Sequence, residues 1–169
     1  MNLHDLLAAT HLKKEEIGRI IGEDPRMFHQ LYELSYSGEM PFCWRATWIM
    51  DHLAELYPGL AENYIEKIWK EVFRDHPVGV TRSSIRLLTR YDIPEAYEGL
   101  AADRCMEWLE KESVPPALKV YGMEILLKLV RLYPDLKHEI MTIIEEQAPN
   151  NSAGFKARAV HILRAMKKI

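Results

Sequence analysis

The sequence predicts an all-α protein, and two observations lead to that prediction. The first is the placement of proline, because successive proline joints lie 15 to 21 residues apart and the segments between them contain none. Proline is tolerated in the first turn of a helix and is costly in its interior, so an even spacing marks a series of helix starts. The second is that apolar residues in these segments recur at i, i+3 and i+4, which is the period of one helix face, whereas no convincing two-residue alternation of a strand is present.

The expected helices follow the prolines in order. Residues 1–24 do not fit the spacing and are expected to form a short N-terminal helical cap. The remainder is expected to form four degenerate helix pairs, at residues 25–57, 58–91, 94–133 and 134–169. We expect the whole chain of 169 residues to form a single domain. Apolar stripes mark the first helix of the last three pairs: Leu60, Tyr64, Ile68 and Val72; Tyr97, Leu100, Cys105 and Trp108; and Leu136, Ile140, Ile143 and Ile144.

The helices also repeat. Four cations early in alternate helices, Arg45, Arg82, Lys119 and Lys156, are each separated by 37 residues, and the letters "LYP" at 56–58 return at 132–134. A period of 20 to 50 residues built from helix pairs predicts an α-solenoid, in which each pair buries its apolar face against its neighbours. The very apolar segment 115–134 is therefore expected to be an inner helix, apolar on nearly every side because a partner lies on each side.

Each unit of a helix, a short joint and a second helix resembles the HEAT repeat. The similarity is carried by "DHPVGVTRSSIRLL", "SVPPALKVYGMEILL" and "APNNSAGFKARAVHIL", and less regularly by "GEMPFCWRATWIMDHL": a joint with Asp or Pro, then a valine-like residue and a cation before small and aliphatic residues. The resemblance covers about residues 25–169 and implies a short right-handed α-α superhelix. HEAT-like stacks serve mostly as scaffolds and occasionally as enzymes, so the resemblance bears strongly on fold and little on function.

Composition excludes several classes of protein. A chain that is 48% hydrophobic and 28% charged, with a net charge of −3, is expected to be soluble and cytoplasmic. Charged residues interrupt the first twenty positions and also the segment 115–134, so we expect neither a signal peptide nor a membrane span. Cys43 and Cys105 lie far apart without CxxC spacing, so they are expected to be reduced, buried thiols.

Basic residues supply the candidate contact surfaces. The 37-residue ladder could line the inner surface as an anion-binding row, but in HEAT-like repeats the equivalent cation usually pairs with acids or carbonyls, for which Asp51, Asp75, Asp92 and Asp135 are available. Arg82, Arg86 and Arg90 form a second row, a stripe on one helix that is either a contact surface or a solvated face. The inner-face candidates for binding are Arg45, Trp48, His52, Arg82, Arg86, Lys119, Glu124 and His161.

The C-terminal segment carries the one clear charge asymmetry. Residues 147–169 contain five cations and no Asp or Glu. Such a helix could meet phosphate or an acidic partner, although cations near a helix C-terminus also favour the helix dipole without any ligand. The overall acidity of the chain argues against extended, non-specific binding to nucleic acid.

The function expected from these features is a non-catalytic scaffold that binds a protein or peptide on a concave face, as a monomer or homodimer, without cofactor or metal. The alternative is a nucleic-acid-binding or base-repair protein, because HEAT-like glycosylases that remove alkylated bases cradle DNA with tryptophans and an aspartate, and "CWRATWIMDH" offers Trp44, Trp48, Asp51 and His52. The spacing of His11 with Glu15 and of His29 with Glu33 is only a weak indication of a metal site. The serine-rich signature loop of fumarase-type lyases has no counterpart here.

Overall fold

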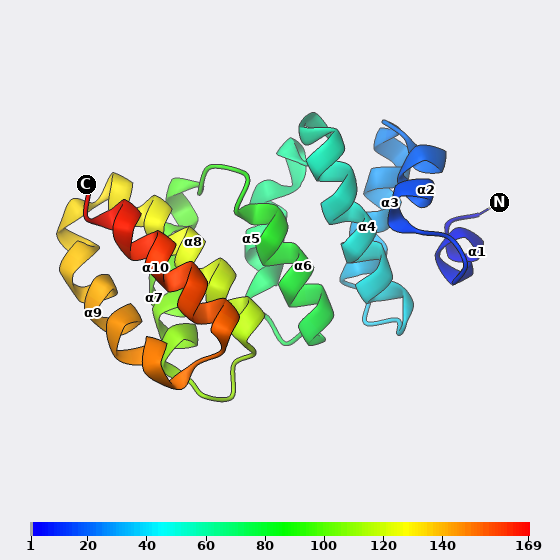
Figure 1. Cartoon of the computed structure of the whole chain (residues 1–169). Coiled ribbons are helices and arrows are strands. Elements are labelled where there is room, and N and C mark those ends of the chain that lie inside the picture. The colour runs from blue at the N-terminus through cyan, green and yellow to red at the C-terminus, as the bar shows by residue number, and fades with distance from the viewer. Residues whose placement is uncertain (1) are drawn as a thin grey trace. The chain divides into compact units, whose positions relative to one another are not determined.

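The computed structural model describes residues 2–169, which form ten α-helices joined by turns and short 3₁₀ helices (Figure 1). Over these residues the secondary structure contains no strand, so the prediction of an all-α chain is confirmed. The first residue of the expected cap, Met1, lies outside the described range. The chain divides into two compact units, the first ending at Tyr91 and the second running from Asp92 to Ile169.

In the first unit, α4 is the central helix. It packs against α3, α6, α2 and α1, and α5 packs against α6. Nine residues of α4 are buried, which is why its sequence is apolar on several sides. The helices of this unit are α1 (Leu3–Ala8), α2 (Lys14–Ile21), α3 (Pro25–Ser35), α4 (Phe42–Leu56), α5 (Ile65–Val72) and α6 (Val78–Leu88).

In the second unit, α8 has the same central place. It packs against α7 and α10, while α9 contacts both of these helices. The segment 115–134 is thus an inner helix, as its apolar character predicts, and no helix within residues 2–169 is long and apolar enough to cross a membrane. The helices of this unit are α7 (Glu95–Glu110), α8 (Pro116–Leu132), α9 (Lys137–Gln147) and α10 (Ala153–Met166).

Most prolines stand at helix starts. Pro25 is the first residue of α3, Pro77 and Pro94 are the N-caps of α6 and α7, and the Pro115–Pro116 pair begins α8. The prolines of the two "LYP" sequences behave differently. Pro58 and Pro134 begin 3₁₀ segments, Pro58–Leu60 and Pro134–Leu136, and the α-helices α5 and α9 start only after them.

The two units repeat this joint in detail. Tyr57 ends α4 with φ −131° and ψ 74°, and Tyr133 ends α8 with φ −130° and ψ 80°. In both cases the tyrosine N–H donates to the carbonyl four residues earlier, Leu53 or Leu129, at 2.7 Å. The sequence repeat at 56–58 and 132–134 therefore encodes one backbone turn that occurs once in each unit.

A glycine lets α2 pack closely against α4. Gly18 of α2 is buried against His52, and a Cβ atom at Gly18 would lie 3.0 Å from Cδ2 of that ring. Gly22 then ends α2 with φ 58°, a left-handed conformation that side-chain-bearing residues avoid, and its N–H donates to the carbonyl of Gly18.

Candidate functional site on α4 and α6

The candidate site is the open face of α4 and α6, the two helices that pack side by side in the first unit. Gly79 permits a close approach, because a Cβ atom there would lie 3.4 Å from Cβ of Trp44. Residues that point away from this packing are half-buried or exposed, and Val78 is 52% exposed. We call this set the α4–α6 face: Arg45, Trp48 and Glu55 of α4 with Val78, Arg82 and Arg86 of α6.

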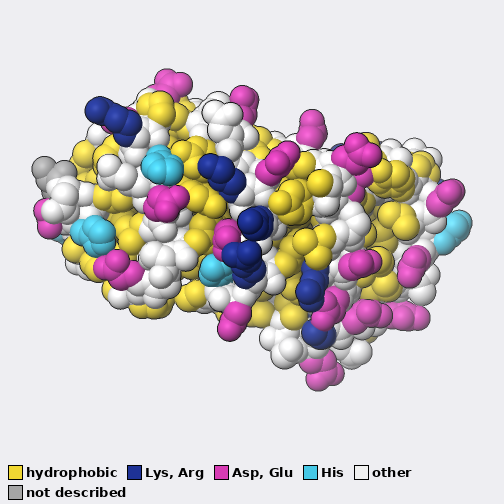
Figure 2. Space-filling model, turned by 180° about the vertical axis from the view of Figure 1, so that it is seen from behind, with side chains coloured by type: hydrophobic (Ala, Val, Ile, Leu, Met, Phe, Trp, Pro, Cys, Tyr) yellow, Lys and Arg dark blue, Asp and Glu magenta, His cyan; other side chains and the backbone are white. Residues whose placement is uncertain are grey.

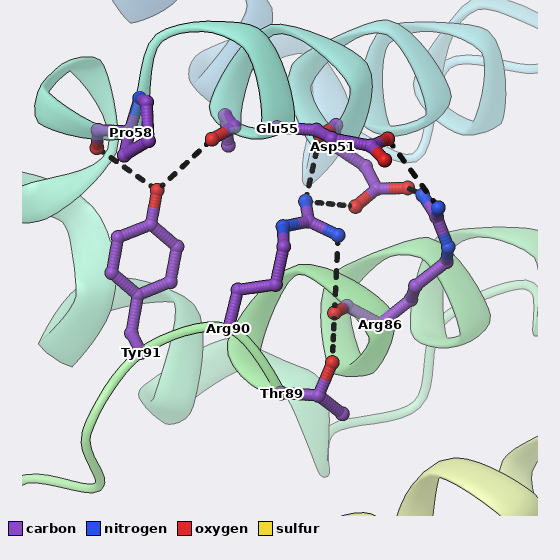
Figure 3. Close-up of polar contacts among 8 residues, drawn as sticks. Asp51, Glu55, Pro58, Arg86, Thr89, Arg90 and Tyr91 are labelled. Atoms are coloured by element: carbon purple, nitrogen blue, oxygen red, sulfur yellow. Dashed lines mark hydrogen bonds and ion pairs between the residues drawn. The ribbon is translucent and has the colours of Figure 1, made fainter.

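A cluster of charges, which includes Glu55 and Arg86 of this face, joins the two helices (Figure 3). The carboxylate of Asp51 accepts a hydrogen bond from Nη1 of Arg86 on one oxygen and from Nη2 of Arg90 on the other, the second at 2.5 Å. Nη2 of Arg90 also donates to the backbone carbonyl of Asp51 at 2.8 Å. Arg86 reaches on to Glu55, with 3.4 Å between Nη2 and Oε2. We call these four residues the Asp51 clasp.

The clasp is electrically balanced and partly shielded from water. The side chain of Asp51 is 4% exposed, that of Arg90 27% and that of Arg86 34%. Partial burial raises the pKa of Glu55, but the charges of Arg86 and Arg90 outweigh that effect and hold the pKa below its usual value. Two arginines thus face two carboxylates. Removing a partner of the buried Asp51 carboxylate would be costly, because both of its oxygens are hydrogen-bonded.

Two further polar contacts lie near the C-terminal end of α6. The hydroxyl of Thr89 donates to the carbonyl of Arg86 at 2.6 Å, and the hydroxyl of Tyr91 donates to the carbonyl of Pro58 at 2.9 Å, at the end of α4 (Figure 3). Together with the clasp, the Tyr91 contact joins the C-terminal end of α6 and the residues just after it to the C-terminal half of α4.

A simpler version of the same arrangement occurs in the second unit. Glu124 of α8 and Arg158 of α10 form an ion pair with 2.6 Å between Oε1 and Nη1. The acid precedes its arginine by 34 residues there, close to the 35 residues between Asp51 and Arg86. The sequence predicts Glu124 as a binding residue of an inner face, and the structure gives it a partner inside its own unit.

The four cations of the 37-residue ladder have different environments. Lys119 is 2% exposed, and its Nζ donates to the carbonyl of Leu109, near the end of α7, at 3.2 Å, while burial lowers its pKa. Arg45 is half-buried, whereas Arg82 and Lys156 are exposed. Lys119 thus pairs with a carbonyl, one of the two kinds of partner expected for the ladder, whereas Asp51, one of the available acids, is bonded by Arg86 and Arg90.

The remaining candidate residues also differ in how far they are exposed. Trp48 is half-buried on the α4–α6 face and His161 is exposed on α10, but His52 is 8% exposed, and neither ring nitrogen has a hydrogen-bond partner among residues 2–169. His52 therefore contributes to packing against α2 and does not present its ring on the face.

Sequence reasoning missed an aromatic cluster formed by α3, the 3₁₀ segment Glu62–Tyr64 and the start of α5. Tyr32 lies 5.1 Å from Tyr64 between ring centroids, and the ammonium of Lys67 lies over both rings, at 5.9 and 5.2 Å. The i, i+4 spacing of Tyr32 and Tyr36 was the available signal, but nothing in the sequence placed Tyr64 and Lys67 beside them. Such rings attract a cation through their π faces, and Lys67 already supplies that cation.

The two His–Glu pairs do not gather into a metal site. His29 and Glu33 both line a pocket of about 630 Å³ beside α1, but Nδ1 of His29 lies 3.1 Å from the hydroxyl of Tyr64. Within residues 2–169, no group of three or more His, Cys, Asp or Glu side chains is placed to hold a metal ion.

Helices one repeat apart, α4 with α6 and α8 with α10, pack on each other and are joined by acid–arginine contacts. This arrangement is that of an α-helical repeat protein. A family model for the HEAT repeat domain matches residues 5–166, and the chain belongs to that family. Comparisons with curated proteins and with solved structures found no match. HEAT repeat domains are repeat scaffolds typically used for protein interaction.

Proposed function

We propose that this chain is a non-catalytic scaffold that binds a protein or peptide on the α4–α6 face. The observation that carries the proposal is the composition of that face: half-buried Trp48 and exposed Val78 stand beside Arg45 and Arg82. Tryptophan and arginine are the residues that contribute most to the centres of protein interfaces. The Asp51 clasp holds α4 and α6 together before a partner binds. Binding therefore costs little free energy for ordering these helices.

The charge balance favours a protein partner over nucleic acid. Nucleic-acid binding depends on many uncompensated cations that meet phosphates. In the α4–α6 face, Arg86 is already engaged by Asp51 and Glu55. Of the three arginines on α6 and just after it, Arg82 alone is exposed without an ion pair among residues 2–169. A row of three arginines in the sequence therefore amounts to one available charge.

The same contacts weigh against base-repair chemistry at Asp51. A catalytic carboxylate must reach a water molecule or the substrate. The side chain of Asp51 is 4% exposed and accepts hydrogen bonds from two guanidinium groups, which fill both of its oxygens. We further propose a cytoplasmic location, which is supported by two buried cysteines without a disulfide.

The test is partner capture with a variant that alters the face without breaking the clasp. Val78→Asp/Arg82→Glu changes two exposed side chains, and an acid in the first turn of α6 favours the helix dipole. Tagged wild-type and variant chains are expressed in the native host, and retained proteins are quantified by mass spectrometry. We expect a specific protein to be retained by the wild type and lost from the variant, with unchanged helicity.

A matched control and a nucleic-acid arm make the test decisive. Lys70→Glu changes an exposed cation of α5, away from the face, and is expected to leave capture intact. Equal capture by Val78→Asp/Arg82→Glu would rule out the face as the binding surface. Tight binding of undamaged or alkylated duplex DNA that weakens steeply with salt would instead favour the nucleic-acid function.

A further inference from the structure

The outward side of α10 is a face that no other helix of the second unit covers. Val160 is 58% exposed, and a shallow hollow of about 320 Å³ lies along Val160, Leu163, Arg164 and Lys167. Lys156 lies one turn before Val160 on the same side of the helix. We call these five residues the α10 face. It is separate from the α4–α6 face and belongs to the second unit.

Comparison with α8 shows what this face corresponds to. Counting 37 residues back along the repeat, Val160, Arg164 and Lys167 correspond to Met123, Leu127 and Val130. These residues of α8 are all buried, with exposed fractions of 0%, 5% and 0%. The α10 face therefore corresponds to the side of α8 on which the next helix of the repeat packs. In α10, some of the apolar residues found on that side of α8 are replaced by cations.

The charges of this face are not balanced by the chain around them. Residues 147–169 contain no Asp or Glu, and Arg158 is the cation of α10 that forms an ion pair, with Glu124. Lys156, Arg164 and Lys167 form none among residues 2–169. An uncovered helix face needs polar residues for solubility, but solubility alone does not require charges of a single sign around an exposed valine.

A groove of complementary character lies on the opposite helices of the same unit. It runs along α7 and the turn that leads into α9, has a volume of about 650 Å³ and includes the apolar side chains of Met106 and Leu136. We call it the α7–α9 groove. On the face shown in Figure 2, acidic side chains are interspersed with hydrophobic ones over the second unit. The groove's carboxylates are Glu95, Glu98, Asp103 and Glu139, of which Glu98 accepts a hydrogen bond from Tyr133.

We propose that the α10 face of one copy docks into the α7–α9 groove of a second copy of this chain. Val160 and Leu163 would meet the apolar floor, and Lys156, Arg164 and Lys167 would meet the carboxylates at its rim. The match of an apolar centre with opposite charges on each side is the argument for a second copy as the occupant. This proposal does not depend on the α4–α6 face or its partner.

The contact is heterologous, because two different surfaces of the chain meet. Each added copy leaves one α10 face and one groove unoccupied, so the association continues as a chain of copies and does not stop at a symmetric dimer. Its strength depends on exposed charge pairs, and it therefore weakens as salt screens them.

Charge reversal on each surface, followed by mixing, tests the proposal. Sedimentation velocity is measured over a concentration series for the wild type, for Lys156→Glu/Arg164→Glu and for Asp103→Lys/Glu139→Lys. We expect the mean mass of the wild type to rise with concentration and to fall with added salt. Each variant alone is expected to associate more weakly, on the order of ten-fold or more, because like charges then face each other.

An equimolar mixture of the two variants is the decisive sample. Each reversed surface then faces a surface of opposite sign on the other variant, so association is expected to return. A matched control, Arg19→Glu/Lys70→Glu, alters two exposed cations of the first unit and is expected to behave as the wild type. Circular dichroism checks that every variant is folded.

Three results would overturn the proposal. They are a wild type that stays monomeric at every concentration, association that both variants retain, and a mixture that does not associate. Binding of the monomeric wild type to poly-L-glutamate or to anionic lipid vesicles through the α10 face would show that an acidic polymer or membrane, and not a second copy, is the occupant.

Discussion

Arg90 holds Asp51 at two points, with Nη2 2.5 Å from the carboxylate oxygen Oδ1 and 2.8 Å from the backbone carbonyl of the same residue. One guanidinium nitrogen, just after the end of α6, thus bonds both the side chain and the backbone of one residue of α4. The contact joins residues 39 positions apart and belongs to the packing of one helix pair on the next.

The first prediction concerns the stability of this contact. Arg90→Met removes one partner of a nearly buried carboxylate and is expected to lower the free energy of unfolding by about 2 kcal/mol, less than a fully buried pair because Arg90 remains partly exposed. Arg104→Met, which removes an exposed i, i+3 pair with Glu107, serves as control and is expected to cost about 0.5 kcal/mol or less. Urea unfolding of both variants measures the difference, and equal costs would contradict a special role for the clasp.

The second prediction concerns the contact between Gly18 and His52. Gly18→Ala gains helix propensity but places a methyl group 3.0 Å from the buried ring. In a His52→Ala background the ring is gone, so we expect Gly18→Ala to be more favourable there by about 1 kcal/mol than in the wild type. A double-mutant cycle by thermal or urea unfolding measures this coupling. Additive effects would mean that the His52 ring moves aside without a cost in free energy, and would contradict the prediction.

The third prediction separates two glycines by backbone conformation. Gly22 has φ 58° and ψ −149°, a combination that residues with a side chain rarely adopt, so Gly22→Ala is expected to destabilise by about 1–3 kcal/mol. Gly99 lies inside α7, where an added methyl group would meet no neighbouring side chain within 4 Å, and Gly99→Ala is expected to stabilise by roughly 0.5–1 kcal/mol. Opposite signs in the unfolding midpoints are the expected outcome.

The fourth prediction is a pH dependence that arises from Lys119. Burial lowers the pKa of its ammonium group, so the folded protein releases this proton at a lower pH than the unfolded chain. The unfolded state then binds more protons over that interval, and stability rises with pH there. We expect the wild type to gain stability relative to Lys119→Met as the pH is raised from 7 toward the ordinary lysine pKa. A stability difference that stays constant with pH would contradict it.

Periodic features of the sequence predicted the architecture well. Proline spacing gave the helix starts at Pro25, Pro77, Pro94 and Pro116 because the missing N–H and fixed φ of proline act locally. The apolar character of α8 predicted its central place, since apolar residues on every side require a partner on every side. The same local rules did not predict the 3₁₀ segments at Pro58 and Pro134, where the turn geometry of Tyr57 and Tyr133 delays the next α-helix.

The site was less predictable, because charge pairing depends on contacts between helices. The arginine stripe of α6 was visible in the sequence, but its partners were not, since Asp51 lies 35 and 39 residues earlier on another helix. His52 looked like an available polar residue, and only packing against Gly18 reveals that it is covered. Equal spacing of Arg45, Arg82, Lys119 and Lys156 also did not give equal environments, because burial depends on the neighbours of each helix.

Site-specific photo-crosslinking in the native host tests the central claim, that the α4–α6 face binds a protein, most directly. A photoreactive amino acid is placed at Arg82 in one sample and at Lys70, outside the face, in another. The account predicts that irradiation yields a covalent adduct of one defined protein from position 82 and none from position 70. Adducts of equal yield at both positions, or no adduct at position 82, would contradict it.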